Sequence, residues 1–410
     1  MNIWMVNHYA LPPSLPGGTR HFCLARELNS RGHNTSIIAA NCNHINGRVA
    51  GLAPGKAWAY TSDQGVPFLW LKSSRCGRSG LSRLANMLSF ASRAGRGVGT
   101  ENLPKPDLIY AASPHHFAAS SVRKLARRHR VPYILEVGDL WPETLIELGG
   151  FSAWHPLILA LGRMERSLYR SADGIVTLLP GSEEHIIERG GNRETITAIP
   201  NGVDMKSVPE LRPVSRGSGP FTIVYAGAHG FANGLDTALD AAVLLASRAG
   251  AENIRFRFIG SGVEKERLMQ RALDENLNNV VFEDSVPKAK IFDALMDSHA
   301  CYLPLLKSPL FEKGISPNKL YDYMASGRPV IFAVSSRLNP VESAQCGLTI
   351  KPDDPEAVAD AAINLARMDP DEADAMGSRG RQFVEHKHGF ERLAEDLESF
   401  ILRIVEERDL

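Results

Sequence analysis

The chain has 410 residues, with 46 basic and 46 acidic side chains and five scattered cysteines. This length exceeds what one hydrophobic core usually holds, so two domains are expected. An odd number of cysteines, never spaced as CxxC, argues against a disulfide framework or a zinc module and favours free thiols in a reducing cytoplasm. The N-terminus lacks a signal-peptide pattern, and no apolar window approaches the roughly 18–20 residues of a membrane-spanning helix, so we expect a soluble or peripheral protein.

Charge is distributed unevenly along the sequence. Residues 1–180 contain 20 Lys and Arg against 10 Asp and Glu, so the remainder of the neutral chain is acidic. This asymmetry indicates that the first part meets an anionic surface, nucleic acid or membrane, or that it carries an ordinary solvated basic face.

Apolar runs alternate with helical periods through the first half of the chain. Buried strands are expected at 2–6, 34–40, 107–112, 132–137 and 174–179, separated by helices such as 19–31, 116–130 and 155–171. This alternation predicts a parallel sheet with helices on both faces.

The segment 71–97 is basic and amphipathic. Its cations are Lys72, Arg75, Arg78, Arg83, Arg93 and Arg96, and its apolar side chains are Leu81, Leu84, Met87, Leu88 and Phe90. The pattern suits a helix that lies on an anionic membrane leaflet. An ordinary surface helix with its apolar face in the core has the same pattern, so both interpretations stay open.

Two glycines follow the first expected strand. Gly17 and Gly18 open a helix there, where the backbone can approach a ligand and helix N–H groups can hold phosphate. The stretch is not G-x-G-x-x-G, and no acidic residue ends the second strand at the usual distance. A dinucleotide-dependent dehydrogenase is therefore disfavoured.

Polar residues lie at the ends of two later strands of the first half. His115, Glu136 and Asp139 are placed there, so we expect them to face a cleft, although His115 could equally be a packing residue. Asp139 precedes Trp141 and Pro142, and a hydroxyl acceptor beside a flat aromatic side chain suits a sugar.

A Pro-, Gly- and Ser-rich stretch without periodicity separates the two halves, and we take it as a linker at 205–220. The predicted first domain is 1–204, the predicted second domain is 221–390, and helix 391–410 could pack back on the first. Strands are expected in the second domain at 221–227, 254–260, 279–284, 300–306, 329–334 and 347–350, with helices around 234–250, 263–276, 287–298 and 317–326. The fold class is α/β, with two doubly wound, Rossmann-like domains facing each other across a cleft.

The second domain offers two half-sites for an anion. In FIGSGVEKERL, Gly260 and Gly262 follow a strand and Lys265 lies in the first turn of the next helix. In SPNKLYDYMASGRPV, at 316–330, Ser316 is expected to cap a helix whose first turn carries Lys319. Both lysines then lie at the strand-to-helix edge of one sheet, where a diphosphate is their natural partner.

A metal site is not expected. The only D-x-D is Asp369-Pro370-Asp371, in a polar loop away from any strand end, where a helix start is the better interpretation.

Four motifs carry a resemblance to a known family. They are PNGVD at 200–204, the GSG…K loop at 260–265, VVFEDSVPKAKI at 280–291 and SPNKLYDYMASGRPV at 316–330. In order and spacing they resemble the retaining nucleotide-sugar glycosyltransferases of family 4, which have the two-domain GT-B fold. EVGDLWPET and YAGAHGFANGLDTALDAA further resemble the bacterial subgroup that transfers N-acetylated amino sugars, such as N-acetylfucosamine, in O-antigen and capsule assembly.

The resemblance implies a donor site in which Lys265 and the amides from Ser316 to Lys319 hold the diphosphate. Val286 meets the nucleobase through its backbone, and Asp322 stands where the second acidic residue of the family's E-x7-E pattern binds ribose. The implied donor-binding set is Gly17, Gly18, Asn201, Gly227, Gly260, Gly262, Lys265, Val286, Gly314, Ile315, Ser316, Asn318, Lys319 and Asp322, with Asp139, His115 and Lys265 as catalytic residues.

The sequence departs from the family pattern in three places. The first Glu of E-x7-E falls on Gly314, with Glu312 two residues away. The Arg and Lys often found after the first strand of the second domain are replaced, and only His229 and Asn233 are available there. Val137-Gly138-Asp139 also lacks the basic residue that many relatives carry before the Asp.

The implied activity is a retaining hexosyltransferase reaction. A sugar, expected to be an N-acetylated amino sugar, moves from a UDP-linked donor to a lipid-linked saccharide of bacterial surface polysaccharide. The expected protein is cytoplasmic and peripheral at the membrane, with no metal, no other cofactor and no nucleic-acid partner. Double displacement is unsupported, because the sequence offers no paired carboxylates at a credible separation. The resemblance implies same-face attack, with the leaving diphosphate taking the acceptor's proton. A nucleotide-sugar 2-epimerase and a non-catalytic nucleotide-sugar-binding subunit are the alternatives.

Overall fold

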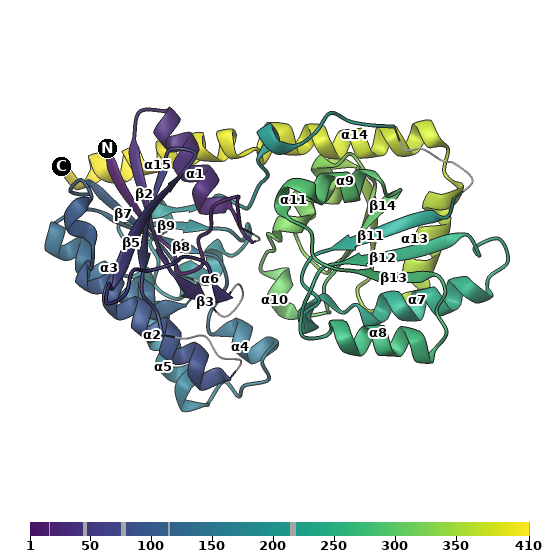
Figure 1. The fold of residues 1–410 in the computed structure, drawn as a ribbon, viewed down its shortest axis with the longest axis horizontal. Helices are drawn as coiled ribbons and strands as arrows, with labels where there is room; N and C mark the ends of the chain where they lie inside the picture. The colour runs from purple at the N-terminus through teal and green to yellow at the C-terminus, as the bar shows by residue number, and fades with distance from the viewer. Residues whose placement is uncertain (16, 44–46, 75–78, 114, 214–218, 410) are drawn as a thin grey trace. The chain divides into compact units, whose positions relative to one another are not determined.

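The computed structural model describes residues 1–15, 17–43, 47–74, 79–113, 115–213 and 219–409. The chain divides into two compact units, one formed by Met1–Asn201 with Phe390–Leu410 and the other by Gly202–Gly389 (Figure 1).

The stretch predicted as a linker, 205–220, falls within the second unit, and its described part is tied to that unit. The Arg381 guanidinium donates to the Pro209 carbonyl at 2.6 Å, and the Arg328 guanidinium donates to the Arg212 carbonyl at 3.0 Å. Arginine side chains thus satisfy carbonyl groups of residues 208–213, which lack helix and strand.

The first unit contains an eight-stranded sheet in the order β10-β9-β8-β7-β1-β2-β6-β5. Its strands are β1 Asn2–Val6, β2 Asn34–Ala40, β5 Trp58–Asp63, β6 Val66–Leu71, β7 Leu108–Ala112, β8 Tyr133–Val137, β9 Gly174–Thr177 and β10 Ile196–Ala198. All pairs are parallel except β5–β6, and β3 Cys42–Asn43 pairs separately with β4 Gly47–Arg48. The five central strands are those that the apolar runs predict.

Helices cover both faces of this sheet (Figure 1). They are α1 Arg20–Ser30, α2 Gly80–Arg96, α3 His116–His129, α4 Glu143–Glu147, α5 Pro156–Tyr169, α6 Glu183–Glu188 and α15 Phe390–Asp409, with short 3-10 turns at Thr100–Asn102 and Arg193–Thr195. The apolar stripe of α15 enters the core of the first unit through Leu393, Leu397 and Ile401. The last helix therefore packs on α1.

The second unit contains a six-stranded, all-parallel sheet in the order β13-β12-β11-β14-β15-β16. The strands are β11 Phe221–Ala226, β12 Ile254–Ile259, β13 Val280–Glu283, β14 Ala300–Pro304, β15 Val330–Ala333 and β16 Gly347–Ile350. The helices are α7 Asp236–Ser247, α8 Lys265–Asp274, α9 Ile291–Met296, α10 Pro309–Glu312, α11 Asn318–Ala325, α12 Pro340–Ala344, α13 Pro355–Arg367 and α14 Pro370–Lys387, with 3-10 turns at Met205–Ser207, Phe231–Asn233 and Lys288–Lys290. The predicted class, two doubly wound α/β domains, is confirmed.

No described helix is both long enough and apolar enough to cross a membrane. Cys42, Cys301 and Cys346 are free thiols, and Cys76 lies outside the described residues.

Candidate functional site

The carboxyl edge of the second sheet carries the candidate anion site. Strands β11 and β14 are neighbours in space but not in sequence, so the connections leave them in opposite directions along the sheet. Doubly wound sheets bind ligands outside the carboxyl ends of the strands at such a point. The loop after β11 begins with Gly227, which is close to Lys319 of α11: a Cβ added to Gly227 would lie 3.6 Å from Lys319 Nζ.

Glycines let the loops after β11 and β12 pack backbone against backbone. A Cβ added to Gly260, whose φ is +148°, would lie 1.9 Å from the Gly227 carbonyl oxygen. A Cβ added to Gly262 would lie 2.2 Å from the His229 carbonyl oxygen. Any other residue would push the loops apart, so the structure supplies a packing reason for both glycines.

Lys319 is a half-buried cation with neutral partners. Its ammonium donates to the Tyr225 hydroxyl at 2.8 Å and to Asn233 Oδ1, and lies 4.5 Å from the centre of the Tyr225 ring. Burial lowers the pKa of Lys319 to about 7. A bound anion would restore the charge, because an opposite charge nearby favours the protonated amine.

His229 is enclosed at the same edge. Its side chain is fully buried beside the rings of Phe258 and Phe282, and neither ring nitrogen has a hydrogen-bond partner among the described residues. Burial, and then the charges of Lys265 and Lys319, lower the pKa of His229 to about 4. The ring is therefore neutral at physiological pH.

Lys265 is the first residue of α8, which follows β12, and its side chain reaches the end of the neighbouring strand β13. Its ammonium donates to the Glu283 carbonyl and to Asp284 Oδ1, both at 2.8 Å. The Asp284 side chain is fully exposed, so this ion pair is weak and leaves Lys265 able to exchange its partner for a ligand phosphate.

The start of α11 differs in detail from the sequence prediction. Pro317, in an extended conformation, occupies the N-cap, and the helix begins at Asn318, so Ser316 is not the capping residue. Ser316 and Ile315 are buried, Gly314 has a positive φ of +120°, and the Glu312 side chain is exposed. Helix amides at Asn318 and Lys319 lie in the first turn, whose N–H groups lack intrahelical partners.

Asp322 lies one turn further along α11 and is buried. Lys288 Nζ donates to its Oδ2, whereas its Oδ1 is buried without a hydrogen-bond partner among the described residues. Lys288 belongs to the segment after β13 that also carries the half-buried Val286. The ion pair could not be predicted from the sequence, because the two residues are 34 positions apart.

His115 lies in a hydrogen-bonded chain inside the first unit. The Ala118 N–H donates to His115 Nδ1 at 3.4 Å, so the proton lies on Nε2, which donates to His8 Nδ1 at 3.0 Å. His8 Nε2 then donates to Asn86 Oδ1 at 2.8 Å. Both His115 nitrogens are engaged and the side chain is fully buried, so this geometry gives His115 a structural role.

Glu136, also predicted to face a cleft, is buried in a cationic cluster. Its carboxylate bonds Arg20 Nε and His21 Nε2, both at 2.9 Å, and accepts from the Tyr110 hydroxyl at 2.5 Å. Burial opposes ionisation, but the charges of His21 and Arg20 hold the pKa of Glu136 well below its usual value. The expectation for Glu136 was wrong, since a buried, fully paired carboxylate is a structural element.

Asp139 is exposed just beyond β8, in the same unit. The loop that carries it is fixed by His116, whose Nε2 donates to the Trp141 carbonyl at 3.0 Å. Of the other predicted residues of this unit, Gly17 and Gly18 are exposed ahead of α1, and Asn201 is buried at the point where the chain leaves the unit.

Each of the two units matches a family model of glycosyltransferases. Residues 18–202 match the family model described as a glycosyl transferase 4-like domain, and residues 220–368 match glycosyl transferases group 1. The HepE protein of Anabaena, solved in complex with UDP-glucose, matches 100% of the chain and 99% of its own length with a TM-score of 0.66 at 14% identity. The chain consists of two glycosyltransferase domains in the GT-B fold.

Two curated relatives cover part of this GT-B chain. WbjE of Pseudomonas aeruginosa, assigned as a glycosyltransferase, is 25% identical over 254 residues, which are 58% of the chain and 60% of WbjE. WcaL of Escherichia coli, assigned to colanic acid biosynthesis, is 25% identical over 238 residues, which are 58% of both proteins. The chain thus spans about three-fifths of the curated relatives that it matches.

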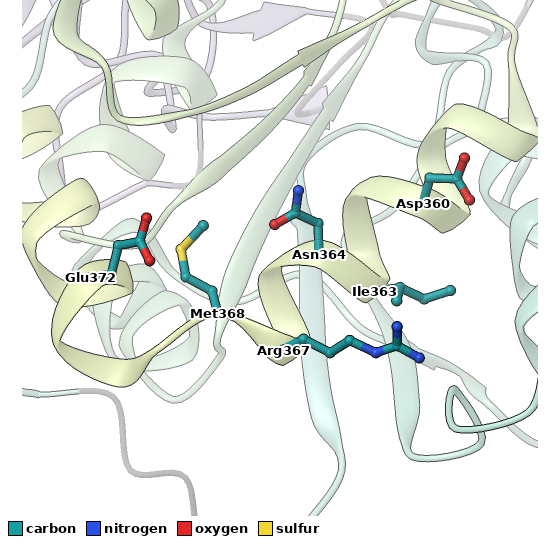
Figure 2. Close-up of a pocket in the computed structure, with 6 residues that line it drawn as sticks. All are labelled: Asp360, Ile363, Asn364, Arg367, Met368 and Glu372. Atoms are coloured by element: carbon teal, nitrogen blue, oxygen red, sulfur yellow. The ribbon is translucent and has the colours of Figure 1, made fainter.

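The GT-B chain also has an open pocket of about 460 Å³ away from the carboxyl edge. Residues of α13 and the start of α14 line it: Asp360, Ile363, Asn364, Arg367, Met368 and Glu372 (Figure 2). Helix α13 follows β16 and runs back along the sheet, so its last turn lies toward the amino ends of the strands. None of the candidate site residues lines this pocket.

The described residues contain no group of three His, Cys, Asp or Glu side chains arranged as metal ligands. His229, His116 and Lys288 were not among the predicted site residues. A lone His after a strand, or a Lys in a polar loop, is too common a pattern to single out.

Proposed function

We propose that this protein transfers a sugar, with retention, from a UDP-linked donor to a lipid-linked saccharide in bacterial surface polysaccharide biosynthesis. The observation that carries the proposal is Lys319, a half-buried lysine with neutral partners and a pKa lowered to about 7, beside close-packed glycine loops at the switch point of a glycosyl transferases group 1 domain. At such a site we expect the binding free energy to be most favourable for a multiply charged anion.

The nucleotide is proposed from two further observations. HepE, of the same fold, binds UDP and UDP-glucose. Asp322 has a buried oxygen without a partner in the described part of the chain, suited to ribose hydroxyls. An N-acetylated amino sugar as the donated group rests on the sequence resemblance, and the polysaccharide pathway is supported by WcaL.

In the proposed reaction the bond from the sugar to the diphosphate breaks while the acceptor hydroxyl attacks the same face. The leaving diphosphate takes the acceptor's proton, and Lys319, Lys265 and the α11 amides stabilise its charge. One such preorganised contact is worth about 2.7–4 kcal/mol of transition-state stabilisation. Asp139 of the first unit is proposed as a hydroxyl acceptor on the sugar side.

We expect transfer of the sugar from a UDP-linked N-acetylated amino sugar, with formation of UDP, only when a bacterial membrane extract supplies the acceptor. Chelation of divalent metals should not lower the rate of transfer. The measurement is UDP formation with a panel of nucleotide sugars, with and without membranes and chelator. Retention is read from the anomeric configuration of the product. Donor epimerisation without membranes would indicate a 2-epimerase. Binding without turnover would indicate a non-catalytic subunit. Activity that is lost on chelation and restored by magnesium or manganese would indicate a metal requirement.

Helix α2 supports a peripheral membrane location. Leu81, Leu84 and Leu88 recur on one side of the helix and are 81%, 37% and 45% exposed, whereas Phe90 is buried in the core. Arg83 and Arg96 are exposed on the same helix. An exposed leucine row with flanking arginines is typical of a helix that inserts shallowly into an anionic leaflet. Arg75 and Arg78 lie outside the described residues.

We expect the protein to sediment with anionic vesicles at low salt, and Arg83→Glu with Arg96→Glu to release it. Each cation near an anionic surface contributes about 1 kcal/mol, so a double charge reversal weakens partitioning by well over tenfold. Arg127→Glu, an exposed cation on α3, is the control. Equal sedimentation of all forms would contradict membrane docking through α2.

A further inference from the structure

The Lys288–Asp322 ion pair connects the segment after β13 to helix α11. Lys288 Nζ donates to Asp322 Oδ2, and the two side chains are 31% and 8% exposed. Lys288 begins a single 3-10 turn, Lys288–Lys290, that follows Val286 and Pro287. The pair therefore holds the loop proposed to meet the nucleobase against the carboxylate proposed to meet the ribose.

The other oxygen of Asp322 is unsatisfied. Oδ1 is buried and has no hydrogen-bond partner in the part of the chain that the structure describes. Its neighbours Leu320, Tyr321, Tyr323 and Met324 are buried in the core beneath the sheet. A buried carboxylate oxygen without a donor is costly, so its retention points to a ligand that supplies one.

A carboxylate only accepts hydrogen bonds, so the missing group must be a donor. The phosphates of a nucleotide offer only acceptors at neutral pH, whereas each ribose hydroxyl offers a proton. The ammonium of Lys288 pairs with the carboxylate and fixes it through Oδ2.

We propose that Lys288 is a positioning residue, which orients the Asp322 carboxylate so that Oδ1 accepts the ribose hydroxyls of the donor. This inference rests on the proposed function. It assigns Lys288 a part in the recognition of ribose, as distinct from the diphosphate that Lys319 and Lys265 meet.

The test uses the full chain and calorimetric titration with UDP and with 2′,3′-dideoxy-UDP, which lacks both ribose hydroxyls. Lys288→Met should weaken UDP about tenfold, the loss expected for a hydrogen bond to a charged group that is no longer held in place. Its affinity for dideoxy-UDP should change by less than about twofold. Lys288→Arg, which keeps a cation, should restore most of the UDP affinity. Lys290→Met, an exposed cation on the same turn, is the control and should bind both ligands like the wild type.

Three results would overturn the inference. An equal loss for both ligands would make Lys288 a phosphate or base contact. Tighter UDP binding by Lys288→Met would make Lys288 a competitor for the ribose position, and unchanged binding would show that Lys288 has no part in UDP binding.

If Lys288→Met does not fold, Lys288→Arg and Asp322→Asn are measured instead. Lys288→Arg should bind UDP like the wild type. Asp322→Asn should lose affinity for UDP but not for dideoxy-UDP. Wild-type protein that binds no UDP contradicts the proposed function and this inference together, whereas equal wild-type affinity for UDP and dideoxy-UDP contradicts the inference alone.

Discussion

The affinity of the wild-type protein for UDP should fall as pH rises above about 7, by up to tenfold per pH unit, and Lys319→Met should remove this dependence. In the free protein burial lowers the pKa of Lys319 to about 7, so the amine is increasingly neutral above that pH. A bound diphosphate favours the charged amine and raises its pKa. Binding then takes up a proton, and each further pH unit makes that uptake less favourable until the pKa of the complex is reached.

The measurement is titration calorimetry of UDP between about pH 7 and pH 9 in buffers of different ionisation enthalpy, which reports proton uptake directly. Above pH 7 the terminal phosphate, whose pKa is about 6, is already ionised and does not add to the signal. Lys319→Arg is the matched control, because its guanidinium stays charged and its affinity should vary little with pH. Lys319→Met should bind UDP roughly ten- to a hundredfold more weakly at pH 7, the range for hydrogen bonds to charged groups. A wild-type slope equal to that of Lys319→Met would contradict the assignment.

The lowered pKa of Lys319 also predicts that this residue favours UDP binding but lowers the stability of the folded protein at pH 7. Between pH 7 and 10.5 the unfolded chain carries a proton on Lys319 that the folded chain tends to lose. The unfolded state therefore binds more protons, and stability from this group rises with pH across that window. At pH 7 Lys319→Met should leave the apo melting temperature unchanged or raise it, whereas a purely structural lysine would lower it.

The sequence predicted all six strands of the second sheet and strands β1, β2, β7, β8 and β9 of the first, because buried parallel strands are continuous apolar runs between helical segments. The three-residue strand β10 was missed. The β5–β6 hairpin was missed. Strand β5, WAYTSD, alternates weakly and is only half-buried, and β6 contains Pro67. Gly65 was the available signal in the sequence, because glycine favours the positive φ of a tight hairpin turn. In the structure Gln64 and Gly65 have φ of +45° and +83°.

Site residues could be predicted where their position along one element decides their place. Gly227 and Lys319 meet because Gly227 follows the end of β11 and Lys319 lies in the first turn of α11, which begins at the same edge of the sheet. The surroundings of His115 could not be predicted, because its partner His8 lies 107 residues earlier and their contact depends on the packing of several helices. Residues at strand ends are similar in sequence whether they face solvent or the interior.

Glu136→Gln should destabilise the first unit by about 3–5 kcal/mol, the cost of leaving a buried cation without its partner. Arg20, 5% exposed, would lose the carboxylate that balances it while it remains bonded to the Pro200 and Ile199 carbonyls at 2.6 and 2.8 Å. Glu184→Gln is the control from the same unit. Its ion pair with Arg193 is 67% exposed on both sides, so the loss should be below about 1 kcal/mol.

The measurement for Glu136→Gln is calorimetric unfolding, which separates the transitions of the two units, repeated as a function of pH. Because the pKa of Glu136 is held below its ordinary 4.5, its contribution is complete above about pH 4.5 and is lost as pH falls toward the folded value. The wild-type advantage over Glu136→Gln should therefore shrink on acidification. UDP affinity should be unchanged at temperatures where both forms are folded, since the proposed nucleotide contacts lie in the second unit. A variant with normal stability and lost sugar transfer would instead make Glu136 a catalytic group. Its charge would then act on the reaction rather than on Arg20, the cation that joins α1 to residues 199–200 after β10.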